Sequence, residues 1–197
     1  CADCRAPNPE WASLRYGVTL CSECSSVHRS FGTHISRVKG LVYDRWNEDQ
    51  LGVLLALGNN RANELFEADV PADIDRPTAT TERRAREKFI IQKYREKAFV
   101  PKSGFPKAVA DLNRELIRAA ASPQCDLSRI MILLTLGAEA NVRTEDGRTL
   151  LHLAAQNSNA VLLEFAALHA IDVNSVDLRG QNPLHVAATM NHSKCVR

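Results

Sequence analysis

The stretch CADCRAPNPEWASLRYGVTLCSECSSVHR, residues 1–29, decides how the first part of this chain folds. It contains two Cys-x-x-Cys pairs, Cys1 with Cys4 and Cys21 with Cys24, and sixteen residues lie between the pairs. A gap of two residues lets both sulfurs of a pair face one ion across a tight turn, and two such pairs complete a tetrahedral four-thiolate site. The spacing therefore predicts one structural zinc ion, because four thiolates leave no open coordination position for catalysis.

The composition is that of an ordinary globular protein. Of the 197 residues, 45% are hydrophobic and 24% are charged, which suits one or two domains with real cores. No run approaches the roughly 20 apolar residues that a membrane span needs. Two further cysteines, Cys125 and Cys195, are scattered, so the pattern favours a reduced intracellular compartment over a disulfide framework. Because the chain opens at Cys1, its first candidate ligand, we expect it to be a fragment whose targeting signals cannot be read.

The distribution of charge argues against a nucleic-acid partner. Residues 1–40 carry five basic and three acidic side chains, which leaves a net charge of +2. A four-cysteine finger that grips the phosphates of DNA needs a much stronger basic stripe. We therefore expect no nucleic acid among the partners.

Short strands and helices alternate in the first part of the chain. A helix is expected after Asn47, which can act as its N-cap, with Gly58 as its stop. Residues 69–80 contain two prolines and little apolar material, so we expect a loop there. The predicted elements are strands over residues 16–21 and 37–43 and helices over about residues 48–57, 61–67 and 82–98.

The helix predicted over residues 82–98 carries a dense run of basic residues after Thr81, its expected N-cap. We expect its seven Arg and Lys side chains, Lys93 among them, to form a solvated face with the intervening glutamates. A contact with anionic lipid or with an acidic partner is the alternative. The expected buried side consists of Phe89, Ile90, Tyr94 and Phe99.

The last part of the chain repeats. Residues 149–155 (TLLHLAA) return as residues 182–188 (NPLHVAA), so that His152 and His185 lie 33 residues apart. This period and the T-P-L-H-x-A signature resemble ankyrin repeats. An upstream unit near residues 116–121 (LIRAAA) matches only loosely, as expected of a capping repeat. With prolines and a glycine near residue 104 as the joint, we expect two domains, residues 1–105 and residues 106–197, the second partial and truncated at its C-terminal end.

One arginine completes the cysteine pattern. The sequence reads C-x2-C-x16-C-x2-C-x4-R from Cys1 to Arg29, with residues 11–13 (WAS) between the pairs and residues 28–30 (HRS) after them. This pattern resembles that of the Arf GTPase-activating proteins, and the likeness covers about the first 100 residues. With ankyrin repeats following, the chain further resembles the centaurin-type multidomain members. The likeness continues through residues 32–39 (GTHISRVK), Asp44 with Trp46, residues 57–59 (LGN) with Asn63, and Lys93 with Tyr94.

The resemblance implies both a fold and an activity. The implied fold is an α+β zinc-finger domain, a small sheet flanked by helices, followed by an all-α ankyrin-repeat solenoid. Arg29 would be the catalytic finger, inserted in trans into a GTP-bound Arf-family GTPase, which supplies the attacking water, its orienting glutamine and the magnesium ion. Such a protein is a regulator that completes another protein's catalytic site and is not a hydrolase by itself. We expect a cytoplasmic location, with peripheral membrane association through regions absent here.

Several further residues are candidates for weaker roles. Core packing remains equally consistent for Trp11, and solvated surface remains at least as consistent for Arg37 and Lys39. His28 and His34 are not expected to bind the metal, because four thiolates already saturate it. A catalytically idle scaffold, with ankyrin repeats that recruit other proteins, remains the alternative function. The candidate partner-binding residues are Trp11, Ile35, Arg37 and Lys39, and Asp44, Trp46, Asn59 and Asn63 are expected to make scaffold contacts first.

Overall fold

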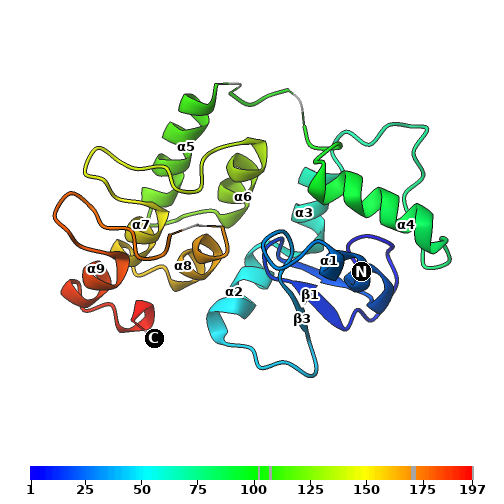
Figure 1. Cartoon of the computed structure of the whole chain (residues 1–197), viewed down its shortest axis with the longest axis horizontal. Coiled ribbons are helices and arrows are strands. Elements are labelled where there is room, and N and C mark those ends of the chain that lie inside the picture. The colour runs from blue at the N-terminus through cyan, green and yellow to red at the C-terminus, as the bar shows by residue number, and fades with distance from the viewer. Residues whose placement is uncertain (102, 107, 170–171, 197) are drawn as a thin grey trace. The chain divides into compact units, whose positions relative to one another are not determined.

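The computed structural model describes residues 1–101, 103–106, 108–169 and 172–196. The chain divides into two compact units, one of residues 1–47 and 54–105 and one of residues 48–53 and 106–197 (Figure 1). Arg197, the predicted end of the repeat segment, lies outside the described residues.

The first unit contains a small antiparallel sheet. Its strands are β1 (Trp11–Ser13), β2 (Val18–Leu20) and β3 (Val38–Gly40), and their order is β2-β1-β3. The outer strands were predicted, although each is shorter than expected, and the central strand β1 was not. A tight turn joins β1 to β2 through Gly17, whose φ of +63° favours glycine and whose Cβ position would lie 2.6 Å from Leu57.

The other described elements of the first unit are helical. The helix predicted after Asn47 with Gly58 as its stop is confirmed, since α2 ends at Ala56 and Gly58 has a left-handed φ of +72°; Gly58 is also the first residue of the next helix. Glu82 is the N-cap of α4, in place of the predicted Thr81, whose hydroxyl accepts a hydrogen bond from the Thr78 N–H. The helix predicted over residues 82–98 is α4 followed by one wide π-helical segment, η1. The helical elements of the first unit are α1 (Ser22–Ser30), α3 (Gly58–Phe66), α4 (Arg83–Ile90) and η1 (Ile91–Arg95). Helix α2 (Glu48–Ala56) is divided, because its residues 48–53 belong to the second unit.

Aromatic side chains form much of the core of the first unit. The ring of Tyr16 packs edge-on against Phe66, with centroids 5.3 Å apart, and lies 4.5 Å from the ring of Tyr94. Phe89 and Phe99 pack together at 5.3 Å. The predicted buried side of the residue 82–98 segment is thereby confirmed, since Phe89, Ile90, Tyr94 and Phe99 are all buried.

The second unit is built from helices that follow the 33-residue period. Two of them start in the same way, because Thr149 with His152 and Asn182 with His185 each form a capping box. The His152 Nε2 atom lies 2.9 Å from the Gln181 carbonyl oxygen and joins one repeat to the next. No helix among the described residues is long and apolar enough to cross a bilayer. The elements are α5 (Val109–Ala121), α6 (Leu127–Leu136), α7 (Leu150–Gln156), α8 (Ala160–Ala167), α9 (Pro183–Thr189) and the 3-10 turn η2 (Ser193–Cys195).

Candidate metal centre and arginine site

The four cysteines of the two Cys-x-x-Cys pairs converge in the first unit. Their sulfur atoms all lie within 4.8 Å of one another, and the Cys4 and Cys21 sulfurs are 3.6 Å apart. Four sulfurs held at about 2.3 Å around a tetrahedral zinc ion would be about 3.8 Å apart, so the spacing fits this ion. Burial raises the pKa of the Cys24 thiol, and the charges of Asp3 and the neighbouring cysteines raise it further, so a cation is needed to hold Cys24 as a thiolate.

The two cysteine pairs lie in different local structures. The first pair closes a turn in which the Arg5 N–H donates to the Cys1 carbonyl oxygen over 3.1 Å, and Arg5 adopts a left-handed φ of +62°. The second pair lies at the start of α1, where Cys21 is the N-cap and Cys24 falls in the first turn. The cysteine cluster therefore holds the N-terminal end of α1.

Arg29 lies in the last turn of this same helix. Its side chain is exposed, and the guanidinium carbon stands 4.6 Å from the centroid of the Trp11 ring. Trp11 is half-buried on β1, so one part of its ring packs against the protein while another part is free to contact a cation. Among the residues that the structure describes, no carboxylate pairs with Arg29. The site therefore presents an unneutralised guanidinium at the protein surface.

The other candidate partner-binding residues are more dispersed. Ile35 is half-buried in the segment after α1, and Arg37 is exposed just before β3. The Lys39 ammonium lies 4.8 Å from the centroid of the Trp46 ring and donates to the Arg45 carbonyl oxygen. The structure thus brings Trp11 to Arg29, whereas it holds Lys39 against a different aromatic ring.

The expected scaffold residues make scaffold contacts. Asp44 accepts a hydrogen bond from the Gly40 N–H over 2.6 Å, and the Trp46 indole donates to the Gly40 carbonyl oxygen over 2.9 Å. The Asn59 amide bonds both the backbone N–H and the hydroxyl of Thr19. These contacts fix the loop after β3 and the edge of the sheet.

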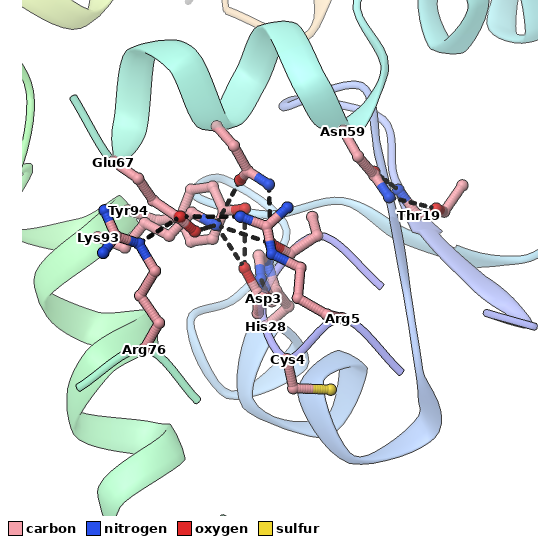
Figure 2. A network of polar contacts seen from close by, with 12 residues as sticks. Asp3, Cys4, Arg5, Thr19, His28, Asn59, Glu67, Arg76, Lys93 and Tyr94 are labelled. Atoms are coloured by element: carbon pink, nitrogen blue, oxygen red, sulfur yellow. Dashed lines mark hydrogen bonds and ion pairs between the residues drawn. The ribbon is translucent and has the colours of Figure 1, made fainter. Parts of the chain in front are cut away.

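Lys93 does not lie on the solvated face that the sequence predicted. Its side chain is fully buried, and its ammonium forms ion pairs with the carboxylates of Asp3 and Glu67 (Figure 2). The π-helical segment η1 turns both Lys93 and the adjacent Tyr94 into the core, and helical periodicity cannot foresee such a bulge. The Lys93 ammonium donates to Asp3 Oδ1 at 2.9 Å, Glu67 Oε1 at 2.7 Å, Asn63 Oδ1 at 2.7 Å and the Ala2 carbonyl oxygen at 3.2 Å.

Asp3 is the centre of this buried network. Burial by itself raises the pKa of the Asp3 carboxyl, but the Lys93 ammonium and His28 outweigh it and hold that pKa well below its ordinary value. The Tyr94 hydroxyl also donates to Asp3 over 3.0 Å. Burial first and the Asp3 charge second raise the pKa of Tyr94 well above its usual range. Asp3, which lies between Cys1 and Cys4 in the sequence, is thus kept ionised by hydrogen bonds from Lys93, Tyr94 and His28.

A second basic side chain of the predicted solvated face is also buried. Arg86 is 5% exposed, and its guanidinium donates to the carbonyl oxygens of Ala79 and Thr81. Carbonyl oxygens of the loop before α4 therefore compensate the buried Arg86 guanidinium. The pattern of charged residues in the sequence does not reveal these backbone acceptors.

The two histidines near Arg29 are not part of the cysteine cluster. His28 is fully buried and bonds Asp3 and Ser36 instead, and His34 is exposed. Among the described residues, the only group able to hold a metal ion consists of the four cysteines. The expectation that neither histidine is a ligand agrees with this geometry.

Known proteins resemble both parts of the chain. The ArfGap family model (GTPase activating protein for Arf) matches residues 1–103, and a model of ankyrin repeats in three copies matches residues 116–197. The ARF GTPase-activating protein GIT1 of Homo sapiens is 35% identical over 204 residues, which cover 98% of this chain and 26% of that protein. The corresponding GIT2 of Homo sapiens is 34% identical over 98% of this chain and 27% of its own length.

A third relative is named for the domains that it contains. The Arf-GAP with coiled-coil, ANK repeat and PH domain-containing protein 3 of Homo sapiens is 37% identical over 139 residues, 68% of this chain and 17% of that protein. This chain spans about a quarter of the length of the curated GIT relatives that it matches. The family match extends over more than half of the chain and includes the cysteine cluster, Trp11 and Arg29. The chain belongs to the Arf GTPase-activating protein family and carries ankyrin repeats after its ArfGap domain.

Proposed function

We propose that this chain stimulates GTP hydrolysis on a GTP-bound Arf-family GTPase by inserting Arg29 in trans. The observation that carries the proposal is the exposed Arg29 guanidinium, stacked 4.6 Å from the centroid of the Trp11 ring without a carboxylate partner in the described chain. An arginine with only a structural role would be expected to pair with an acidic neighbour or a carbonyl oxygen. The names of the GIT relatives, which describe ARF GTPase activators, support the same activity.

GTP hydrolysis needs a positive charge beside the phosphate oxygens in the transition state. Negative charge spreads over the phosphate oxygens in the transition state of phosphoryl transfer. An arginine finger stabilises this charge and raises the rate by about 10³–10⁵-fold. The guanidinium keeps its charge at any physiological pH and offers donors in a planar fork that lysine lacks. The Trp11 ring restricts the rotamers of Arg29 before the partner arrives, so that less conformational freedom is lost in the complex.

The remaining residues of this chain support and orient that one side chain. We propose that Cys1, Cys4, Cys21 and Cys24 bind one zinc ion, which when bound supplies no reactive site and adds its binding free energy to folding. The cysteine cluster then fixes one end of α1, and Arg29 projects from the other end. We propose Arg37 and the half-buried Ile35 as contacts with the GTPase near the finger, with Lys39 at the margin because Trp46 already holds it.

Single-turnover hydrolysis on a panel of GTP-loaded Arf-family GTPases tests the proposal. The chain should accelerate hydrolysis on at least one of them, and Arg29→Ala and Arg29→Lys should each lose nearly all of the acceleration while keeping the fold. Arg84→Ala, which alters an exposed arginine on α4, is the matched control and should act like the wild type. Undiminished acceleration by Arg29→Ala would refute the role of Arg29, and the idle-scaffold alternative predicts no acceleration by any variant.

For the second unit we propose a stacked ankyrin solenoid that binds other proteins. The contact between His152 and the Gln181 carbonyl oxygen supports stacking, and so does the Arg143 guanidinium, which donates to the Val176 carbonyl oxygen 33 residues later over 2.8 Å. Repeats of this kind bury their apolar faces only against neighbours. We further propose that the protein acts in the cytoplasm, peripheral to membranes, as the family resemblance implies.

A further inference from the structure

His28, the residue before Arg29, is fixed in the protein interior by hydrogen bonds at both of its ring nitrogens. His28 is fully buried, and both nitrogens of its ring have partners. Its Nε2 atom lies 3.1 Å from Asp3 Oδ2, and its Nδ1 atom lies 2.8 Å from Ser36 Oγ. A buried imidazole bonded at both nitrogens has a fixed ring orientation and a fixed tautomer. The last turn of α1 is therefore fixed from inside the protein.

The hydrogen bonds continue from Ser36 to the central strand. The Ser36 hydroxyl lies 2.8 Å from the hydroxyl of Ser13, and both serines are buried. Ser13 is two residues from Trp11 on β1, so both side chains lie on the same face of that strand. The end of α1 and strand β1 are thus joined twice, at the surface through Arg29 and Trp11 and in the interior through His28, Ser36 and Ser13.

The segment after α1 brings Ser36 back to the helix that it has just left. The Arg29 carbonyl oxygen accepts a hydrogen bond from the Gly32 N–H over 3.2 Å, and the Gly32 carbonyl oxygen accepts one from the Ser36 N–H over 3.0 Å. Gly32 adopts a left-handed φ of +81°, which closes this turn at no steric cost. The return of the chain places the Ser36 hydroxyl between His28 and Ser13.

The direction of each hydrogen bond follows from the donors available. The Asp3 carboxylate can only accept, so in the neutral imidazole the Nε2 atom of His28 carries the proton and the Nδ1 atom accepts. The Ser36 hydroxyl then donates to His28, and the Ser13 hydroxyl donates to Ser36. Each hydroxyl has one proton, so with a neutral imidazole the series runs from Ser13 to His28, and with a protonated imidazole it runs from His28 to Ser13. Either direction joins the same three side chains.

We propose that His28, Ser36 and Ser13, here called the positioning relay, set the rotation of the last turn of α1 so that Arg29 stays over Trp11. The inference rests on the proposed function and makes these three residues positioning residues, none of which contacts the GTPase. A shift of about 1 Å in a group that must meet a transition state can cost on the order of 10² in rate. Loss of the relay should therefore lower the maximal stimulated rate and leave the affinity for the GTPase nearly unchanged.

The first experiment separates rate from affinity. The stimulated single-turnover rate is measured against chain concentration for the wild type, Ser36→Ala and Ser25→Ala. Ser25 is the matched control, because it is a buried serine of α1 whose hydroxyl donates only to the Ser22 carbonyl oxygen of its own helix. We expect Ser36→Ala to lower the maximal rate by roughly tenfold or more, with the half-saturating concentration changed by less than about twofold. Ser25→Ala should keep the wild-type maximal rate.

A second readout does not depend on activity. In NMR spectra of the free chain, the indole ring of Trp11 should shift the side-chain protons of Arg29 upfield, and Arg29→Lys identifies those signals. We expect the upfield shift to shrink in Ser36→Ala and to persist in Ser25→Ala. If the wild type stimulates no GTPase, the proposed function fails, and the NMR shifts alone then decide whether the relay positions Arg29.

A pair of His28 variants separates the relay from the bond to Asp3. The side-chain amide of His28→Asn lies near the former Nδ1 atom and can still bond Ser36, whereas that of His28→Gln extends toward the former Nε2 atom and Asp3. The relay predicts that Asn retains most of the maximal rate and of the NMR shift, and that Gln loses both. The opposite order would overturn the proposal.

Stability and metal content are measured on every variant. A folded Ser36→Ala chain with one bound zinc ion, an unchanged maximal rate and an unchanged NMR shift would overturn the proposal. If Ser36→Ala does not fold, Ser13→Ala decides, because it keeps the His28–Ser36 bond and removes only the link to β1. If every relay variant loses the fold, the relay is structural and the proposal is likewise overturned.

Discussion

Replacing Lys93 by methionine should destabilise the first unit more than any surface change of the same kind. Methionine keeps the length and apolar stem of lysine but removes the ammonium, which is fully buried and has four hydrogen-bond acceptors within 3.2 Å for its three protons. Two of these acceptors are the carboxylates of Asp3 and Glu67, which are 0% and 5% exposed. The substitution therefore leaves two buried negative charges without their common partner.

The structure divides this loss unequally between the two carboxylates. Glu67 keeps the guanidinium groups of Arg5 at 3.0 Å and Arg76 at 3.2 Å, both half-exposed. Asp3 keeps only His28 and the neutral Tyr94 hydroxyl, so most of the cost falls on Asp3. Breaking a buried ion pair by removing one partner costs about 3–5 kcal/mol. A typical domain has a free energy of unfolding of roughly 5–15 kcal/mol, so the variant should be close to unfolding.

Urea unfolding in the presence of zinc, followed by tryptophan fluorescence, measures the effect. Both tryptophans, Trp11 and Trp46, lie in the first unit, so the signal reports on that unit. Lys88→Met, an exposed lysine of α4, is the control and should change stability by less than about 0.5 kcal/mol. The double variant of Lys93→Met with Asp3→Asn should recover part of the loss, because the uncompensated charge is gone. A loss below about 1 kcal/mol for Lys93→Met would refute this reasoning.

Four further outcomes are expected. Trp11→Ala should lower the maximal stimulated rate about two- to fivefold, the equivalent of a surface cation–π contact of about 0.5–1 kcal/mol, in the same single-turnover assay. Atomic absorption should find one zinc ion per chain, and its removal by a chelator should unfold the first unit by tryptophan fluorescence. Because burial raises the pKa of Cys125 to about 11, fewer thiolates are present below that pH. Alkylation at pH 8, followed by mass spectrometry, should be roughly 100-fold slower than for an ordinary thiol and accelerate up to about pH 11. Gly147→Ala should destabilise the second unit by about 1 kcal/mol more than Gly180→Ala in urea unfolding followed by circular dichroism. Both glycines have a left-handed φ, but only the Cβ position of Gly147 would be crowded, at 3.1 Å from the backbone of the next repeat.

The parts of the fold that the sequence predicted are those with a fixed local spacing. The cysteine pairs had to be two residues apart to meet one ion, and the 33-residue period had to recur for one repeat to pack on the next. The family resemblance pointed to Arg29 as the finger, which stays a prediction, and α1 fixes the spacing between Arg29 and Cys24. In each case chemistry or packing constrains positions that are close in sequence or strictly periodic.

The elements that were missed lack such a constraint. Strand β1 has only three residues, and its sequence of tryptophan, alanine and serine shows no apolar alternation; pairing with β2 and β3 on both sides creates it. The solvated face predicted for residues 82–98 assumed a regular helix with all of its charges outside. The π-helical turn at Ile91–Arg95 breaks that periodicity, and the buried acceptors that receive Lys93 come from residues up to 91 positions away.

This contrast follows from what each group must do. A ligand or a finger must have one particular chemistry, so its residue type and spacing are visible in the sequence. A positioning group needs only a hydrogen bond at the right place, and any serine, asparagine or backbone carbonyl brought there by folding can supply it. Ser36 and Ser13 are ordinary serines in the sequence, and only the turn at Gly32 and the pairing of β1 with β3 bring their hydroxyls within 2.8 Å. Residues that orient an exposed side chain are therefore found by following hydrogen bonds inward from its neighbours. In this chain the path starts at His28, the residue before Arg29, and leads through Ser36 and Ser13 to the strand that carries Trp11.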